Sequence, residues 1–256
     1  MSTLTVKDLC KTYIVNKRQN NVLKNINMEI REGEMVAVMG PSGSGKSTLL
    51  YTVSGMDAVT AGSIDFFGKD LSRLCAKEMS GVRLNEMGFV FQQMHMLKNL
   101  TIYDNIILPA YQAAGGRGRG SRAKINELAK ALMHKLQISE IAENAVNEVS
   151  GGQLQRACIC RSLINHPKML FADEPTGALN QQNSKEVMRE LNRINAEGTT
   201  ILLVTHDIKV AAKSDRILYI EDGSIKGEFT LGRFESETEV KDRERKLSNW
   251  LMEMGW

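Results

Sequence analysis

The feature that most constrains this chain is the stretch GPSGSGKST, from Gly40 to Thr48, which directly follows the apolar run MVAVM. It matches the pattern G-x-x-x-x-G-K-[ST], and helical character begins at its lysine. A buried strand, a glycine-rich turn and a helix in this order form a loop whose backbone N–H groups surround a phosphate at the helix N-terminus. The sequence therefore predicts a site for a nucleoside triphosphate.

The members of this loop have distinct expected roles. The glycines allow backbone N–H groups to curl around the β-phosphate, and Lys46 reaches the β- and γ-phosphate oxygens. The hydroxyl of Ser47 is expected to coordinate Mg²⁺. The predicted nucleotide-binding set of the loop is Gly40, Pro41, Ser42, Gly43, Ser44, Gly45, Lys46, Ser47 and Thr48.

A second constraining stretch is FADEPTGALN, in which two adjacent acids follow the apolar residues of an expected strand. Carboxylates at the end of a buried strand are costly unless a charge or a reaction requires them. In phosphoryl-transfer sites a strand-end aspartate holds Mg²⁺ and a second group positions the attacking water. Asp173 fits the metal role and Glu174 the water-positioning role, whereas the same pair elsewhere would be ordinary surface charge.

Composition and charge narrow the class of protein. The chain has 256 residues, of which 42% are hydrophobic and 25% charged, and its net charge of +3 is too balanced to indicate nucleic-acid binding. Its four cysteines lack the paired spacing of metal sites, so we expect free thiols in a reducing cytosol. No apolar stretch reaches the ~18 residues that span a bilayer. We expect a chain that is soluble and cytoplasmic by itself and reaches a membrane only through a partner.

The order of expected elements predicts an α/β protein. Strands such as TLTVKDL, NINMEIR, MVAVM and MGFVF lead into a helical block at about residues 97–148, and strands and helices alternate again from MLFAD onward. Alternation of this kind indicates a parallel sheet with helices on both faces. Within the helical block, GGRGRGSR at residues 115–122 is interpreted as a solvated basic loop.

The segment VSGGQLQR, Val149 to Arg156, resembles the LSGGQ signature of ATP-binding-cassette (ABC) ATPases. The resemblance covers about residues 3–228. It implies a phosphate-loop NTPase (RecA-like) core with a mostly parallel sheet, an antiparallel N-terminal β subdomain and an inserted α-helical subdomain. It also implies that two cassettes enclose two Mg-ATP, with the signature meeting the ATP of the other subunit, here taken to be a second copy of this chain. The signature residues are Ser150, Gly151, Gly152 and Gln153.

The same resemblance assigns four further positions. It gives Gln92 a contact with Mg²⁺ or the attacking water, and His206 a contact with the γ-phosphate that also helps to hold Glu174. Tyr13 matches the aromatic residue that stacks on adenine, although an ordinary strand aromatic remains open. Asn180 replaces the aspartate that usually ends the loop coupling the two subunits. We expect hydrolysis to be retained because Glu174 is intact.

The resemblance also predicts domains, partners and location. Residues 1–91 and 157–230 are expected to form the ATP-binding core, residues 92–156 the helical subdomain and residues 231–256 a C-terminal tail. Within the family, the chain looks most like cassettes of macrolide-exporter, lipoprotein-release and bacitracin-resistance transporters. These cassettes drive permeases resembling the cell-division protein FtsX, which handle peptides, antibiotics, lipids or lipoproteins. This implies a peripheral position on the cytoplasmic face of a bacterial membrane, membrane contact only through the permease and no nucleic-acid partner.

Two other functions remain open at this stage. One is a soluble ABC ATPase acting on ribosomes or DNA, although such proteins usually carry two cassettes or long coiled-coil insertions, and this chain has neither. The other is a non-hydrolysing clamp, which the intact Lys46, Asp173, Glu174 and His206 disfavour.

The tail, VKDRERKLSNWLMEMGW, has the apolar spacing of a short amphipathic helix. Its apolar positions are Val240, Leu247, Trp250, Leu251 and Met254. We expect this helix to pack against its own core or the paired cassette, with docking to the permease or to a membrane surface as the alternatives.

Overall fold

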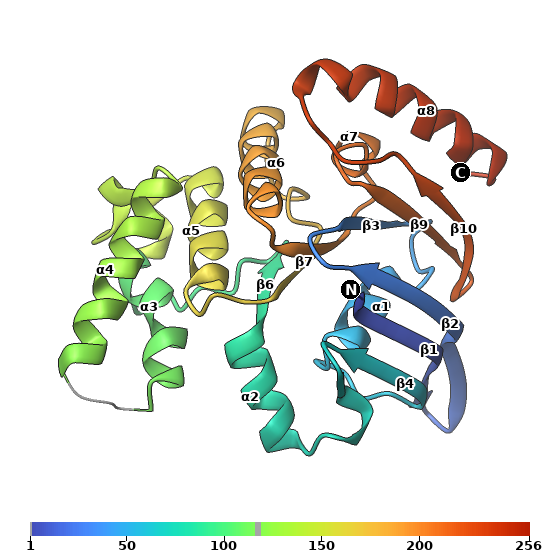
Figure 1. Cartoon of the computed structure of the whole chain (residues 1–256), viewed down its shortest axis with the longest axis horizontal. Helices are drawn as coiled ribbons and strands as arrows, with labels where there is room; N and C mark the ends of the chain where they lie inside the picture. Colours follow the sequence, from blue (N-terminus) through green and yellow to red (C-terminus); the bar gives the residue numbers. More distant parts are fainter. Residues whose placement is uncertain (1, 116–118) are drawn as a thin grey trace. The chain divides into compact units, whose positions relative to one another are not determined.

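The computed structural model describes residues 2–115 and 119–256, and the chain forms two compact units. The first unit comprises Met1–Met79 and Ile194–Trp256, and the second comprises Ser80–Arg193. The chain passes between the units within two helices, α2 (Ala76–Glu86) and α6 (Gln181–Ala196). Figure 1 labels the elements of both units.

An antiparallel sheet with the strand order β2-β1-β4-β5 forms one part of the first unit. Its strands are β1 (Ser2–Val15), β2 (Arg18–Arg31), β4 (Ala61–Phe66) and β5 (Lys69–Asp70). Along β2, the buried residues Ile26, Met28 and Ile30 alternate with exposed ones, as expected for a strand with one covered face. Asn16 and Lys17 both have positive φ and make the two-residue turn between β1 and β2.

The other sheet strands of the first unit have the order β10-β9-β3-β8. They are β3 (Met35–Met39), β8 (Thr200–Val204), β9 (Arg216–Glu221) and β10 (Ser224–Thr230). Every residue of β3 and β8 is buried, which accounts for the apolar run MVAVM of β3 and the apolar residues 201–204 of β8. β3 runs parallel to both β8 and β9, whereas β10 returns antiparallel beside β9. The helices α1 (Lys46–Val53) and α7 (Ile208–Ala211) belong to the same unit.

The second unit combines a parallel strand pair with a helical bundle. The pair is β6 (Met87–Phe91) and β7 (Met169–Asp173), and the helices are α3 (Ile102–Ala113), α4 (Arg119–Lys135) and α5 (Gly151–Leu163). α3 packs against α4 and α5, and α5 packs against β6. The buried amide of Asn105 donates to the carbonyls of Leu97 and Thr101 and so fixes the segment before α3.

Most expected elements are present, with two differences. The helix α2 was not predicted, because its buried residues Met79 and Val82 are too few to form an apolar stripe in the sequence. The predicted basic loop at residues 115–122 lies partly outside the described residues, at 116–118, and the remainder is wrong because α4 begins at Arg119. Within residues 2–115 and 119–256, no helix has both the length and the apolar composition needed to cross a membrane.

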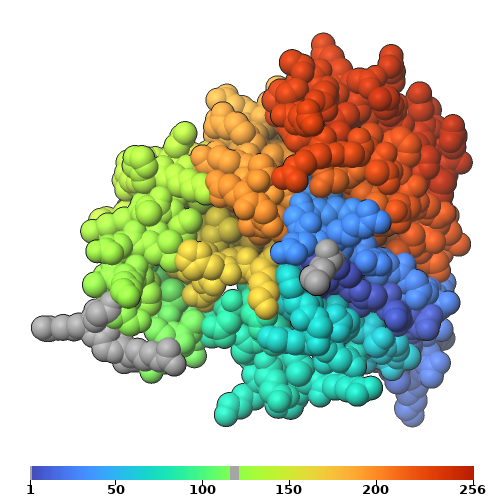
Figure 2. Space-filling model, in the orientation of Figure 1, coloured from blue at the N-terminus to red at the C-terminus, as the bar shows by residue number. Residues whose placement is uncertain are grey.

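The expected tail helix is confirmed as α8 (Val240–Glu253), which packs on the hairpin of β9 and β10 in the first unit (Figure 1). The ring of Trp250 stacks on Phe229 with centroids 5.2 Å apart and meets the edge of Tyr219 at 6.3 Å. Gly227 of β10 allows this approach, since a Cβ there would lie 2.9 Å from the Trp250 ring. The helix forms part of the molecular surface, red in Figure 2. The tail thus packs on its own core.

Arg243 of α8 forms hydrogen bonds with the end of α7 and with the segment that follows β10. The Arg243 guanidinium is 5% exposed and donates five hydrogen bonds to backbone carbonyls. The accepting carbonyls are those of Ala212, Ser214, Leu231, Gly232 and Arg233. Ala212 is the C-cap of α7, so this side chain satisfies helix-end carbonyls that have no partner within that helix.

Arg243→Met should destabilise the protein by about 2–4 kcal/mol, because it removes the donors and leaves buried carbonyls without partners. Urea unfolding followed by tryptophan fluorescence measures this change. The matched control is Arg245→Met on the same helix, whose ion pair with Asp242 is exposed to solvent and whose loss should not be measurable. Equal losses for the two variants would contradict a structural role of the Arg243 bonds.

Candidate active site

The phosphate loop begins at the carboxyl end of β3, the strand that lies between β8 and β9. In parallel sheets, ligands bind at this end of the strands. At Gly40, a Cβ atom would stand 1.9 Å from the carbonyl oxygen of Ile220, so any other residue would push the loop away from β9. The loop therefore depends on glycine at its first position for its close approach to the sheet.

The rest of the loop has the donors that a triphosphate needs. α1 begins after its N-cap Gly45, whose φ is 102° and which has no side chain that could cap the helix. The Lys46 ammonium folds over the loop and donates to the carbonyls of Gly40 and Pro41, both at 2.8 Å. The buried Ser44 hydroxyl has no hydrogen-bond partner among residues 2–115 and 119–256. A helix N-terminus, a buried hydroxyl and a lysine in one place fit bound phosphates.

His206 lies at the same edge of the sheet as the loop. Val38 of β3 pairs with Val204 of β8, and the Thr205 N–H donates to the Val38 carbonyl at 3.1 Å. Gly40 and His206 each follow this pair by two residues. Asp207 then caps α7 by accepting from the Lys209 N–H at 2.8 Å. The first unit thus brings the phosphate loop and His206 together.

Tyr13, near the end of β1, is held by two charged side chains. Its hydroxyl donates to Asp57, and the Lys11 ammonium lies 4.7 Å from the centre of its ring. Lys11 is 6% exposed and binds Asp57 at 2.6 Å and the Ala58 carbonyl at 2.7 Å. The Tyr13 ring is therefore fixed by its surroundings, as suits a base-stacking platform, and the stacking role itself remains a prediction.

The shifts in the pKa values of Tyr13 and Asp57 agree with the hydrogen bond between them. Burial, followed by the hydrogen bond to Asp57, raises the pKa of Tyr13, so its hydroxyl remains a donor. Burial also acts to raise the pKa of Asp57, but the hydrogen bonds from Lys11 and Tyr13 outweigh it and the pKa is lower than usual. At neutral pH, Asp57 is accordingly a carboxylate between two donors.

The second unit positions Gln92 and Glu174 by the same principle of paired strand ends. Phe91 of β6 pairs with Asp173 of β7, and Gln92 and Glu174 are the next residues. A Cβ at Gly177 would lie 2.9 Å from the Gln92 amide nitrogen and 3.4 Å from the Glu174 Cβ. The two side chains predicted to handle the water thus meet around Gly177.

Glu174 has an unusual backbone conformation, with φ at 46°. A non-glycine residue in this left-handed region is strained by about 1–3 kcal/mol, and such residues are concentrated at functional sites. The turn that follows is closed by two backbone hydrogen bonds, from Gly177 N–H to the Glu174 carbonyl and from Leu179 N–H to the Thr176 carbonyl, both at 3.0 Å. Asp173, just before it, is 8% exposed at the end of β7.

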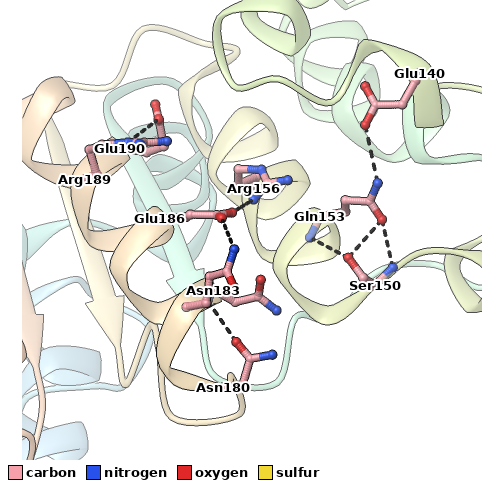
Figure 3. Close-up of polar contacts among 10 residues, drawn as sticks. Glu140, Ser150, Gln153, Arg156, Asn180, Asn183, Glu186, Arg189 and Glu190 are labelled. Carbon is pink, nitrogen blue, oxygen red and sulfur yellow. Dashed lines mark hydrogen bonds and ion pairs between the residues drawn. The ribbon is translucent and has the colours of Figure 1, made fainter.

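The predicted signature forms the start of α5 (Figure 3). Ser150 is its N-cap, and its hydroxyl accepts from the Gln153 N–H at 3.3 Å. The Gln153 amide oxygen accepts in return from the Ser150 N–H at 3.0 Å, and its nitrogen donates to Glu140 at 3.3 Å. This capping box orders the helix start, and Ser150 and Gly151 are exposed there. An ordered, exposed helix N-terminus suits an anion from outside the unit.

Asn180 caps α6, which lies beside α5. Its side-chain oxygen accepts from the Asn183 N–H at 2.9 Å. A Cβ at Gly152 would lie 2.6 Å from the Asn183 side chain, so the two helix starts are in close contact. One turn along, Arg156 and Glu186 form a 2.6 Å ion pair between the helices (Figure 3). The second unit therefore brings the signature and Asn180 together.

The predicted residues thus form two sets. The first unit holds Tyr13, the phosphate loop and His206, and the second holds Gln92, Asp173, Glu174, the signature and Asn180. The proposed magnesium ligands, Ser47, Gln92 and Asp173, offer hydroxyl, amide and carboxylate oxygens. These oxygen donors fit Mg²⁺, which prefers oxygen ligands. Substrate phosphates and water molecules usually supply its remaining ligands.

Sequence reasoning missed three residues that support the site: Lys11, Asp57 and Gln155. Lys11 and Asp57 are 46 positions apart, and no local pattern connects them. Gln155 lies within VSGGQLQR, but one sequence does not show which side of the helix is buried against the catalytic turn. Its side chain binds the carbonyls of Phe91 and Pro175.

Comparison with known proteins places this geometry in a family. Residues 23–177 match the family described as ABC transporter. The chain is 40% identical to the ABC transporter ATP-binding protein YknY of Bacillus subtilis (strain 168) over 87% of this chain and 94% of YknY. It is also 40% identical to the lipoprotein-releasing system ATP-binding protein LolD of Wigglesworthia glossinidia brevipalpis, covering 88% of this chain and 96% of LolD.

Two further similarities concern a longer protein and a solved structure. The macrolide export ATP-binding/permease protein MacB of Bdellovibrio bacteriovorus is 35% identical over 96% of this chain, which spans 37% of that protein. The dimeric post-hydrolysis structure of the ATP-binding cassette MJ0796 bound to ADP and Pi is 36% identical, with a TM-score of 0.82. The match covers 90% of this chain and 100% of the MJ0796 chain. The fold class expected from the sequence is confirmed by this match.

Replacing Asn180 separates capping from charge. Asn180→Ala should cost about 1 kcal/mol of stability, because the α6 cap is lost. Asn180→Asp keeps a capping oxygen and adds a charge, so stability should hold while turnover or its cooperativity changes by more than about twofold. Urea unfolding and ATP-dependence of phosphate release measure the two effects. A change in turnover below that level would remove the coupling role of this position.

Proposed function

This chain belongs to the ABC transporter family of ATPases, and we propose that it hydrolyses Mg-ATP as the ATP-binding subunit of a bacterial transporter. The observation that carries this proposal is the phosphate loop, in which the buried Ser44 hydroxyl and Lys46 lie at the N-terminus of α1. In this proposal Tyr13 stacks on the adenine and Lys46 contacts the β- and γ-phosphates. Gly40 to Thr48 bind the remaining phosphate oxygens.

The proposed reaction is attack of water on the γ-phosphorus. A water oxygen–phosphorus bond forms, the bond between the γ-phosphorus and the bridging oxygen of ADP breaks, and Glu174 takes the water proton. Gln92, which meets Glu174 around Gly177, holds the same water, and His206 contacts the γ-phosphate. Mg²⁺, held by Ser47, Asp173 and Gln92, would supply charge neutralisation at the phosphates.

A second copy of the chain is proposed to complete each site. The ordered N-terminus of α5 presents Ser150 and its neighbouring N–H groups to the γ-phosphate bound by the other copy. Asn180, which caps the adjacent helix α6, lies in the loop proposed to couple the two sites. The dimeric form of the similar MJ0796 cassette supports this arrangement.

The proposed partner is a membrane permease of the FtsX-like type. Similarity to LolD and to MacB, whose names join an ATP-binding part to lipoprotein release and to macrolide export, supports this partner class. The chain would lie on the cytoplasmic face of the membrane and contact it only through the permease. The cargo would be a peptide, an antibiotic, a lipid or a lipoprotein, without a nucleic-acid partner.

Glu174→Gln should lower kcat for ATP hydrolysis at least about 100-fold, because the variant cannot take the water proton. The same variant should accumulate an ATP-bound dimer, measured by size-exclusion chromatography with light scattering. The control is Glu32→Gln, an exposed carboxylate, which should match the wild type. Equal rates for Glu174→Gln and the wild type would refute the catalytic assignment.

The partner class is tested by purification of the tagged chain from detergent-solubilised membranes of its native host. A multi-spanning membrane protein should co-purify in fixed stoichiometry and should stimulate or restrain the ATPase rate. Recovery of ribosomes or DNA in place of a membrane protein would favour a soluble ABC ATPase and contradict the transporter role.

A further inference from the structure

A buried amide connects the signature helix to the chain on both sides of the proposed catalytic residues. Gln155 lies on α5 and is 1% exposed. Its side-chain nitrogen donates to the Pro175 carbonyl at 2.8 Å and to the Phe91 carbonyl at 3.3 Å. Both partners are carbonyl oxygens, which can only accept, so the nitrogen must face them.

The two carbonyls that Gln155 binds are next in the chain to the proposed catalytic residues. Phe91 is the last residue of β6 and precedes Gln92, and Pro175 directly follows Glu174. Gln155 therefore holds the backbone next to each of the two side chains that meet around Gly177. Since Glu174 has a strained φ of 46°, its conformation must be held by the surrounding structure, and the hydrogen bond to the Pro175 carbonyl holds the next residue.

The cost of this arrangement also argues against a purely stabilising role. The side-chain oxygen of Gln155 is buried and has no hydrogen-bond partner in the part of the chain that the structure describes. An unpaired buried acceptor costs about 1–3 kcal/mol. The two hydrogen bonds that the side chain donates must offset this cost.

We propose that Gln155 is a positioning residue, which sets the geometry of Glu174 and Gln92 from the signature helix α5. The proposal rests on the proposed function, in which these two side chains act on the attacking water. It gives α5 two roles. Its N-terminus meets the second copy's nucleotide, and one turn later its buried face holds the catalytic turn of its own chain.

The variant Gln155→Met keeps the length of the side chain and removes both donors. It should lower kcat for ATP hydrolysis at least about tenfold, because small displacements of catalytic groups have large effects on rate. The KM for ATP should change less than about twofold, since Tyr13 and the phosphate loop are intact. Gln155→Asn keeps the amide but is one methylene shorter, and its kcat should fall between those of Gln155→Met and the wild type.

Asn165 provides a matched control for Gln155. Asn165, which follows α5, also donates from one amide nitrogen to two carbonyls, those of Leu84 at 2.8 Å and Pro109 at 3.3 Å. Asn165→Leu removes an equivalent pair of bonds before the amino ends of β6 and β7, whereas Gln92 and Glu174 follow the carboxyl ends of these strands. It should lower the unfolding midpoint but leave kcat within about twofold of the wild type. Equal kcat losses for Asn165→Leu and Gln155→Met would overturn the proposal.

Two further measurements separate this inference from the proposed function. Hydrogen exchange at the Gly177 amide, which donates to the Glu174 carbonyl, should be faster in Gln155→Met. Unchanged exchange would overturn the positioning role whatever the function of Glu174. In a background that carries both Glu174→Gln and Gln92→Ala, Gln155→Met should alter the residual hydrolysis rate by less than about twofold, because the residue acts through those two side chains. Independent, multiplying effects would also overturn it, whereas full activity of Glu174→Gln alone would refute the proposed catalytic role.

Discussion

The register of parallel strands is the constraint on which the site depends. Val38 pairs with Val204 in the first unit, and Phe91 pairs with Asp173 in the second. Because parallel strands end at the same edge, each pairing places two distant segments beside each other. A slip of one residue would turn every side chain of the strand to the other face and separate the groups that follow. β3, β7 and β8 are buried along their whole length, so their side chains are packed on both faces and a shift would disturb every contact.

Side-chain donors that bind backbone carbonyls are the second recurring device. Asn105 holds the segment before α3, Gln155 holds the ends of β6 and β7, and Arg243 holds the segments around α7 and α8. In each case a buried or largely buried donor satisfies carbonyls at places where regular structure stops. Such places carry functional residues, and an unpaired carbonyl there would be costly. Specific side chains thus hold the irregular backbone at these three places.

The tail helix is held on the first unit by packing of its apolar side chains. α8 buries Leu247 and Leu251 completely, and Trp250 fits against Phe229 where Gly227 leaves space. Its sequence predicted an amphipathic helix and left the surface that it covers open. The stacking of Trp250 on Phe229 shows that this surface is the β9–β10 hairpin of the first unit.

By itself, the sequence determined the elements with strong local chemistry. The apolar runs of β3, β6 and β7, the phosphate loop and the amphipathic tail were all predicted, because each depends on neighbours within a few residues. The helix α2 was not predicted, since its pattern is weak. Only the tertiary structure decided that Asp57 and Lys11 fix Tyr13, that Asn180 caps the helix beside the signature, and that Gln155 holds the strained turn at Glu174. These contacts join residues or helices that strand register and helix packing bring together, and no local sequence pattern encodes them.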